Sequence, residues 1–153
     1  MKPQPGDDAP DFSMQADDGA TVTRQGLLGR RYVLYFYPKD DTPGCTAQAC
    51  SLRDNFERVV DTGIEVYGVS PDSVKRHVAF RAKYSLPYRL LSDTGHAVAD
   101  AYGVWVEKKF AGRSYMGVER SSFIIGPDGK IEHVLERVKP MEHVDLLLDT
   151  LAA

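Results

Sequence analysis

Two cysteines, Cys45 and Cys50, are the only ones in the chain, and a cysteine thiolate is a strong nucleophile. Cys45 directly follows a polar stretch, PKDDTPG, at residues 38–44. Within that stretch Thr42 is a preferred helix N-cap, and Pro43 suits the first helical position, where its missing N–H costs nothing. Cys45 then lies in the first turn of a helix, where the positive end of the helix dipole favours the thiolate. The spacing therefore predicts a reactive cysteine.

The residues on either side of this stretch indicate a strand followed by a helix. Residues 31–37, RYVLYFY, are rich in β-branched and aromatic residues, which favour a buried strand. After the cysteine, apolar residues recur at the spacing of one helix face: Leu52, Phe56, Val59 and Val60. We expect this helix to run to about Gly63, since glycine readily ends a helix. Cys45 is thus predicted at a strand-to-helix junction.

The same stretch carries a motif, P-x-x-x-T-x-x-C, which is filled by Pro38, Thr42 and Cys45. It resembles the active-site signature of the peroxiredoxins. The fuller string FYPKDDTPGCTAQAC is close to the branch called peroxiredoxin Q or bacterioferritin comigratory protein, in which many members carry a second cysteine five residues after the first. The resemblance extends from residues 6–12 through residues 103–105 and 120–123 to the end of the chain. It implies a thioredoxin-like fold and reduction of hydrogen peroxide and organic hydroperoxides.

The resemblance also implies a role for each matched residue. Cys45 would attack the peroxide and become a sulfenic acid, which Cys50 would convert to a Cys45–Cys50 disulfide. Arg120, at the start of a late strand, would stabilise the thiolate and hold the peroxide oxygens, since guanidinium stays charged and offers several donors. Thr42 would help orient the peroxide, and Pro38 would keep water from the thiolate. From the residues alone, an arginine at a strand start is usually surface charge, and Thr42 could be a simple helix cap.

Other polar residues are expected to be ordinary. Thr42 and Cys45 have the spacing of a capping box, with sulfur where Glu or Gln would stand. Gln48 is expected on the exposed side of the helix. The histidines lack metal-ligand spacing relative to the cysteines and are expected at helical surface or strand positions: His77, His96, His133 and His143. No metal, flavin or haem is required by the predicted chemistry.

Composition narrows the function classes. The 153 residues are 42% hydrophobic, which suits one domain over residues 1–153 that can bury its own core. Acidic and basic residues are interspersed and the net charge is −3, so a nucleic-acid partner is not expected. No apolar run suggests a signal peptide or a membrane span, and we expect a cytoplasmic protein. The family resemblance implies a monomer. A thioredoxin-like or glutaredoxin-like protein would supply the electrons that reduce the Cys45–Cys50 disulfide.

Two other functions fit parts of the sequence. The first is a thiol–disulfide oxidoreductase on the same fold, although its usual C-x-x-C is replaced here by C-x-x-x-x-C. The second is a module that binds a partner or a metal without catalysis, although two cysteines supply only half of a tetrahedral thiolate site. Rapid loss of both thiols with one equivalent of hydrogen peroxide would single out the peroxidase.

The remaining pattern alternates strands and helices, which predicts an α/β fold with a central mixed sheet and an N-terminal β-hairpin. A helix that starts at residues 70–73 should turn Val74, Val78 and Ala82 inward. Residues 104–110 give no clear assignment. Other expected elements are a hairpin at 11–15 and 20–24, strands at 64–69, 89–92 and 112–118, a helix ending near 102–103, a hairpin at 120–125 and 130–135, and a last helix from Pro140.

Overall fold

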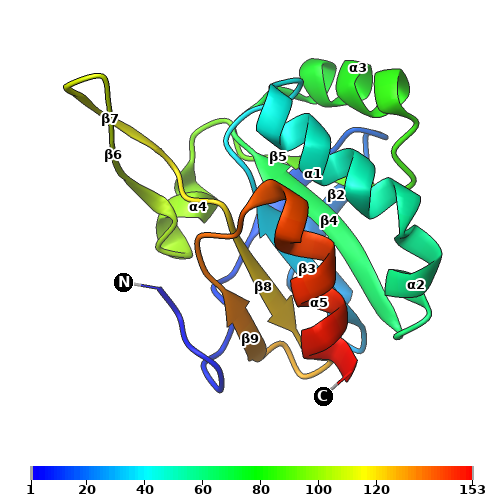
Figure 1. Ribbon diagram of the computed structural model, residues 1–153. Coiled ribbons are helices and arrows are strands. Elements are labelled where there is room, and N and C mark those ends of the chain that lie inside the picture. Colours follow the sequence, from blue (N-terminus) through cyan, green and yellow to red (C-terminus); the bar gives the residue numbers. More distant parts are fainter. Residues whose placement is uncertain (1, 153) are drawn as a thin grey trace.

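The structure is a computed structural model that describes residues 2–152. Within this range seven strands form one mixed sheet in the order β2-β1-β5-β4-β3-β8-β9 (Figure 1). These strands are β1 (Ser13–Ala16), β2 (Thr21–Thr23), β3 (Arg31–Phe36), β4 (Ile64–Ser70), β5 (Arg89–Ser92), β8 (Ser121–Ile125) and β9 (Ile131–Leu135). Parallel pairing joins β3 to β4 and β4 to β5, while β8 runs antiparallel to β3. A separate hairpin, β6 (Trp105–Phe110) and β7 (Arg113–Val118), projects from the sheet.

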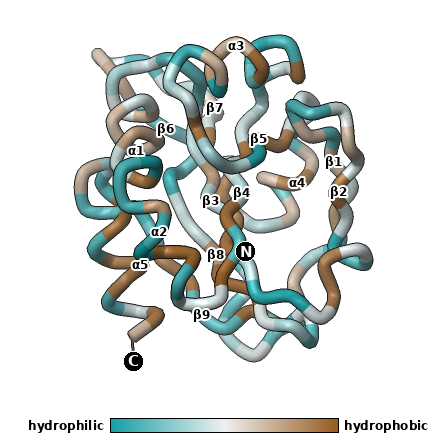
Figure 2. The backbone as a smooth tube through the Cα atoms, turned by 90° about the vertical axis from the view of Figure 1, so that its right-hand side faces the viewer, coloured by the Kyte–Doolittle hydropathy of each residue, from teal (hydrophilic) through white to brown (hydrophobic). Residues whose placement is uncertain are grey.

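Helices cover the sheet, and the hydrophobic core lies in two layers, one on each face of the sheet. Three of them, α1 (Pro43–Asp54), α2 (Phe56–Val60) and α5 (His143–Ala152), lie over one face (Figure 1). The connection between β4 and β5 is α3 (Val74–Tyr84), and the short α4 (Ala97–Ala101) follows β5. Two 3₁₀ turns, η1 (Gln25–Leu27) and η2 (Pro140–Glu142), complete the elements. Figure 2 shows hydrophobic positions concentrated in central strands such as β4 and in α5.

The central strand β3 explains how the two layers form. Successive side chains of a strand point to opposite faces, so Val33 and Tyr35 join the core beneath α1 and α5, whereas Leu34 and Phe36 join the core on the other face. All four side chains are at most 1% exposed. A strand that is buried on both faces has a continuous run of apolar residues, and residues 32–36 form such a run.

Most of the expected elements are confirmed. The N-terminal hairpin, the strands at 31–36, 64–70 and 89–92, and the hairpin of β8 and β9 lie where the sequence predicted them. Residues 105–110, which had no assignment, pair with β7 as β6. The expected domain begins at residue 1 and ends at residue 153, and both of these residues lie outside the described range.

The expectation of one helix running to about Gly63 is wrong. Helix α1 ends at Asp54, and α2 begins at Phe56. Asn55 between them has φ −116° and ψ 16°, outside the helical region, and its side-chain Nδ2 donates to the Ser51 carbonyl oxygen at 2.9 Å. An asparagine side chain that bonds the preceding turn competes with the helical backbone, which accounts for the break.

The expected inward face of α3 is wrong for two of its three residues, since only Val74 is half-buried. Val78 is 48% exposed and Ala82 is exposed, whereas His77 and Phe80 are buried. His77 hydrogen-bonds to Asp40 and to the Leu91 carbonyl oxygen in the interior, and these bonds turn its face of α3 inward. The buried face of α3 therefore contains His77 in place of the expected Val78.

Candidate active site

The polar stretch forms the loop that joins β3 to α1. Thr42 is the N-cap of α1, with extended φ −99° and ψ 156°, and Pro43 is the first helical residue, as expected. The expected capping bond is wrong, because the Thr42 side chain accepts no hydrogen bond from the helix. Its hydroxyl instead donates to the Lys39 carbonyl oxygen at 2.8 Å, which tightens the loop. Within residues 2–152 no donor bonds the Thr42 hydroxyl oxygen, so this oxygen can accept a hydrogen bond.

Cys45 lies in the first turn of α1, only 3% exposed, against Arg120. Arg120 lies between β7 and β8, and its Nη2 donates to Cys45 Sγ at 3.4 Å. Gly44 gives the guanidinium room, because a Cβ there would lie 3.3 Å from Arg120 Nη2 and 3.5 Å from Pro140 Cγ. Two residues 75 positions apart in the chain are thus brought into contact, and both a cation and a helix N-terminus face the sulfur.

Gln48 belongs to this cluster, which corrects its expected exposed position. It is 0% exposed, and its Oε1 accepts from Arg120 Nη1 at 2.5 Å. One side of the guanidinium is therefore held by Gln48 while the other meets Cys45. The amide is neutral, so it fixes Arg120 without cancelling its charge, as a carboxylate would. The signal in the sequence was the three-residue spacing from Cys45, which puts both side chains on one helix face.

Two further basic side chains lie around Arg120. His143, at the start of α5, is fully buried, with Nε2 2.7 Å from Ser122 Oγ. Burial and then the positive charge of Arg120 lower the pKa of His143 to about 3, so its imidazole is neutral at physiological pH. Burial and then the same charge also lower the pKa of Lys108 on β6. Arg120 is thus the fixed positive charge in direct contact with Cys45.

The structure does not bring Cys50 to Cys45. Both cysteines are free and lie on α1, but Cys45 packs in the core beneath the helix, whereas Cys50 is half-buried and lines an open groove with Tyr84. Pro38 lies in the loop just after β3 and is also half-buried. Of the five predicted site residues, Cys45 and Arg120 are in contact. Thr42 is the N-cap residue of the helix that carries Cys45, Pro38 lies in the loop before that helix, and Cys50 lies apart.

The expectation that the histidines occupy surface or ordinary strand positions is wrong for His77 and His143, which are both 0% exposed. His77 also belongs to a group of potential metal ligands in residues 2–152, together with Asp40 and Asp72. These side chains already bond one another or neighbouring donors, with His77 Nδ1 2.6 Å from Asp40 Oδ2. Mutual hydrogen bonding accounts for the cluster without a cation.

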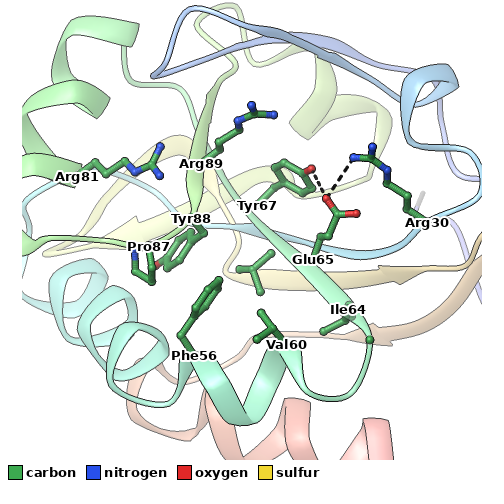
Figure 3. Close-up of a pocket in the computed structure, with 12 residues that line it drawn as sticks. Arg30, Phe56, Val60, Ile64, Glu65, Tyr67, Arg81, Pro87, Tyr88 and Arg89 are labelled. Atoms are coloured by element: carbon green, nitrogen blue, oxygen red, sulfur yellow. Dashed lines mark hydrogen bonds and ion pairs between the residues drawn. The ribbon is translucent and has the colours of Figure 1, made fainter.

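A groove of about 610 Å³ lies elsewhere on the molecule, between α2 and β4 (Figure 3). None of the predicted site residues lines it. Its three arginines are paired: Arg30 with Glu65, Arg81 with Asp17 and Arg89 with Asp18. With these charges already compensated, the groove offers no free charge comparable to that of Arg120.

Comparisons with known proteins agree with one another. The model of the AhpC/TSA family matches residues 5–134. Peroxiredoxin Bcp of Escherichia coli K12 is 46% identical over 146 residues, which cover 95% of this chain and 94% of that protein. A cysteine-to-serine mutant of Xylella fastidiosa PrxQ has a TM-score of 0.91 at 30% identity, with 99% of this chain and 97% of that chain covered.

A further solved structure bears on substrates. Xanthomonas campestris bacterioferritin comigratory protein, studied for its alkyl peroxide reduction activity, has a TM-score of 0.86 at 34% identity. The match covers 92% of this chain and 90% of that chain. These likenesses confirm the predicted thioredoxin-like α/β fold, with its mixed sheet flanked by helices.

Proposed function

Because this chain belongs to the AhpC/TSA family and is a peroxiredoxin, a thiol-dependent peroxidase, we propose that Cys45 is the residue that attacks the peroxide. One observation carries the assignment: the Cys45 sulfur lies 3.4 Å from Arg120 Nη2, in the first turn of α1. A cation and a helix N-terminus both favour the thiolate, which is the nucleophilic form.

The proposed reaction is a displacement on oxygen. The Cys45 thiolate attacks one peroxide oxygen, an S–O bond forms, and the O–O bond breaks. The other oxygen leaves as hydroxide or alkoxide and takes a proton to become water or alcohol, while Cys45 becomes a sulfenic acid. Arg120 donors stabilise the charge on the leaving oxygen. Thr42, whose hydroxyl lone pairs are free, accepts a hydrogen bond from the peroxide, and Pro38 forms a wall of the site.

Cys50 completes the proposed cycle as the resolving residue. Its thiol attacks the sulfenic sulfur, water leaves, and a Cys45–Cys50 disulfide forms. The helix opposes this step, because five residues of regular α-helix separate two Cα atoms by about 8–9 Å, whereas a disulfide spans at most about 7 Å. The first turns of α1 therefore unwind after Cys45 is oxidised, which carries Cys50 to the sulfenic acid.

The proposed substrates are hydrogen peroxide and organic hydroperoxides, which is in keeping with the alkyl peroxide reduction of the Xanthomonas relative. A thioredoxin-like or glutaredoxin-like protein reduces the disulfide after each turnover, and a reducing compartment, the cytoplasm, suits this cycle. Within residues 2–152, no helix is both long and apolar enough to cross a membrane. We propose that residues 1–153 act as one domain and as a monomer.

The proposal is tested by counting thiols. Fully reduced protein mixed with one equivalent of hydrogen peroxide should lose both thiols within seconds, and mass spectrometry should find one intramolecular disulfide. A thiol–disulfide oxidoreductase or a binding module would keep its thiols for much longer. Retention of both thiols over minutes would therefore refute the assignment of Cys45 and Cys50.

Unwinding of α1 makes a second prediction, on hydrogen exchange. Residues 43–52 should exchange their amide hydrogens faster in the disulfide form than in the reduced form, because the first turns of α1 lose their hydrogen bonds. The control is the hairpin of β1 and β2, which lies at the far edge of the sheet and whose protection should stay the same. Equal protection of residues 43–52 in the two forms would show that resolution takes another route.

A further inference from the structure

A buried hydrogen-bonded cluster anchors the loop that leads into α1. Asp40, in that loop, is 2% exposed, and His77, on α3, is fully buried. His77 Nδ1 lies 2.6 Å from Asp40 Oδ2, and the Tyr37 hydroxyl donates to Asp40 Oδ1 at 2.5 Å. Both carboxyl oxygens of Asp40 are therefore engaged, one by the strand side of the loop and one by α3.

The contacts of His77 fix its orientation. Nε2 lies 2.9 Å from the Leu91 carbonyl oxygen, which can only accept, so Nε2 carries a hydrogen. A single proton then lies between His77 Nδ1 and Asp40 Oδ2, bound to one of these two atoms. The pair is neutral as a unit, and the ring cannot turn without breaking hydrogen bonds at both nitrogens.

Asp72 ties the backbone of the same loop to the end of β4. The Asp40 amide donates to Asp72 Oδ2 at 2.8 Å, and Ser70 Oγ donates to the same oxygen at 2.6 Å. Arg76 Nε, on α3, donates to Asp72 Oδ1 at 2.9 Å. The charged groups that face the His77–Asp40 pair thus compensate each other, and Asp40 is held through both its side chain and its backbone.

We propose that Asp40 and His77 are positioning residues for the attack by Cys45. Together they hold residues 38–42 so that α1 begins at Pro43 and the Cys45 sulfur lies against Arg120. Cys45 is only five residues from Asp40, so a shift of the loop moves the sulfur. A misplacement of about 1 Å in reacting groups can cost about a hundred-fold in rate. This inference rests on the proposed function of Cys45.

The neighbouring Asp41 provides a matched control. It also bonds α3, with Lys83 Nζ 2.9 Å and the Tyr84 hydroxyl 3.0 Å from its carboxylate. The side chains of Lys83 and Asp41 are 57% and 42% exposed, and exposed ion pairs contribute little. Asn tolerates the positive φ of 58° at this position, so Asp41→Asn removes the charge without straining the backbone.

The test measures the first chemical step in a Cys50→Ser background, where Cys45 is the one remaining thiol, by quenched single-turnover loss of that thiol. Asp40→Ala, verified as folded by circular dichroism, should react about ten- to a hundred-fold more slowly with hydrogen peroxide. Asp41→Asn should stay within about two-fold of the parent, since its pair is exposed. Asp40→Asn should restore the parent rate, because its amide can accept from Tyr37 and donate to His77 Nδ1.

Two results would overturn the inference. One is a folded Asp40→Ala protein that reacts at the parent rate, and the other is an Asp40→Asn protein as slow as Asp40→Ala.

If Asp40→Ala does not fold, the Tyr37→Phe variant tests the inference instead. It removes one of the two side-chain bonds and should slow the reaction about three- to ten-fold, and an unchanged rate would overturn the inference. A parent protein that does not react at all would instead refute the proposed function of Cys45.

Discussion

Peroxide reduction should fall by on the order of a thousand-fold or more when Cys45 is replaced with Ser, because a hydroxyl stays protonated where a thiol forms a nucleophilic thiolate. The substitution is nearly isosteric and the side chain is 3% exposed, so the fold should be kept. Peroxide consumption in the steady state, with a thioredoxin or glutaredoxin system as reductant, measures the effect. Circular dichroism checks that the variant is folded.

Cys50→Ser is the matched control, since it makes the same atomic change on the same helix. It should reduce one equivalent of peroxide at the parent rate and then stop at the sulfenic acid, which makes it more prone to overoxidation. Sustained turnover in Cys45→Ser would refute the assignment of Cys45 as the attacking residue. Sustained turnover in Cys50→Ser would remove Cys50 from the cycle and leave Cys45 in place.

The sequence was sufficient for those parts of the site that depend on neighbours in the chain. Thr42, Pro43 and Cys45 fall within four residues, and their types alone predict the start of a helix with a cysteine in its first turn. The buried strand β3 was equally predictable, since the six consecutive apolar or aromatic residues 32–37 favour a buried strand. Arg120 required the family resemblance, because nothing near it in the chain distinguishes it from surface charge.

What the sequence could not provide depends on partners far away in the chain. Gln48 is buried because Arg120, 72 residues later, takes its amide oxygen. His77 turns inward because it shares a hydrogen bond with Asp40, 37 residues earlier in the chain. A polar group is tolerated in the interior only when it is hydrogen-bonded. In both cases the polar residue is therefore predicted to be exposed as long as its hydrogen-bond partner is unknown. The sequence pattern carries no sign of that partner.

Arg120 makes the second large prediction. Replacing it with Met should slow the single-turnover reaction of Cys45 with hydrogen peroxide by about a hundred- to a thousand-fold, the usual cost of removing a donor that stabilises developing charge. It should also reduce the fraction of Cys45 present as thiolate at neutral pH, because the cation 3.4 Å from the sulfur is gone. Ultraviolet absorbance of the thiolate across a pH series, in the Cys50→Ser background, measures that fraction.

Three comparison variants separate charge from geometry at Arg120. Arg137→Met removes an arginine that is 84% exposed and should leave the rate unchanged. Arg120→Lys keeps the charge but loses the two-sided contact with Cys45 and Gln48, so its rate should lie between those of Arg120→Met and the parent. Gln48→Glu keeps the contact but offsets the charge, and should lower the thiolate fraction without moving Arg120. An Arg120→Met protein with the parent's rate and thiolate fraction would exclude Arg120 from the reaction, and the short distance to Cys45 would then be a packing contact alone.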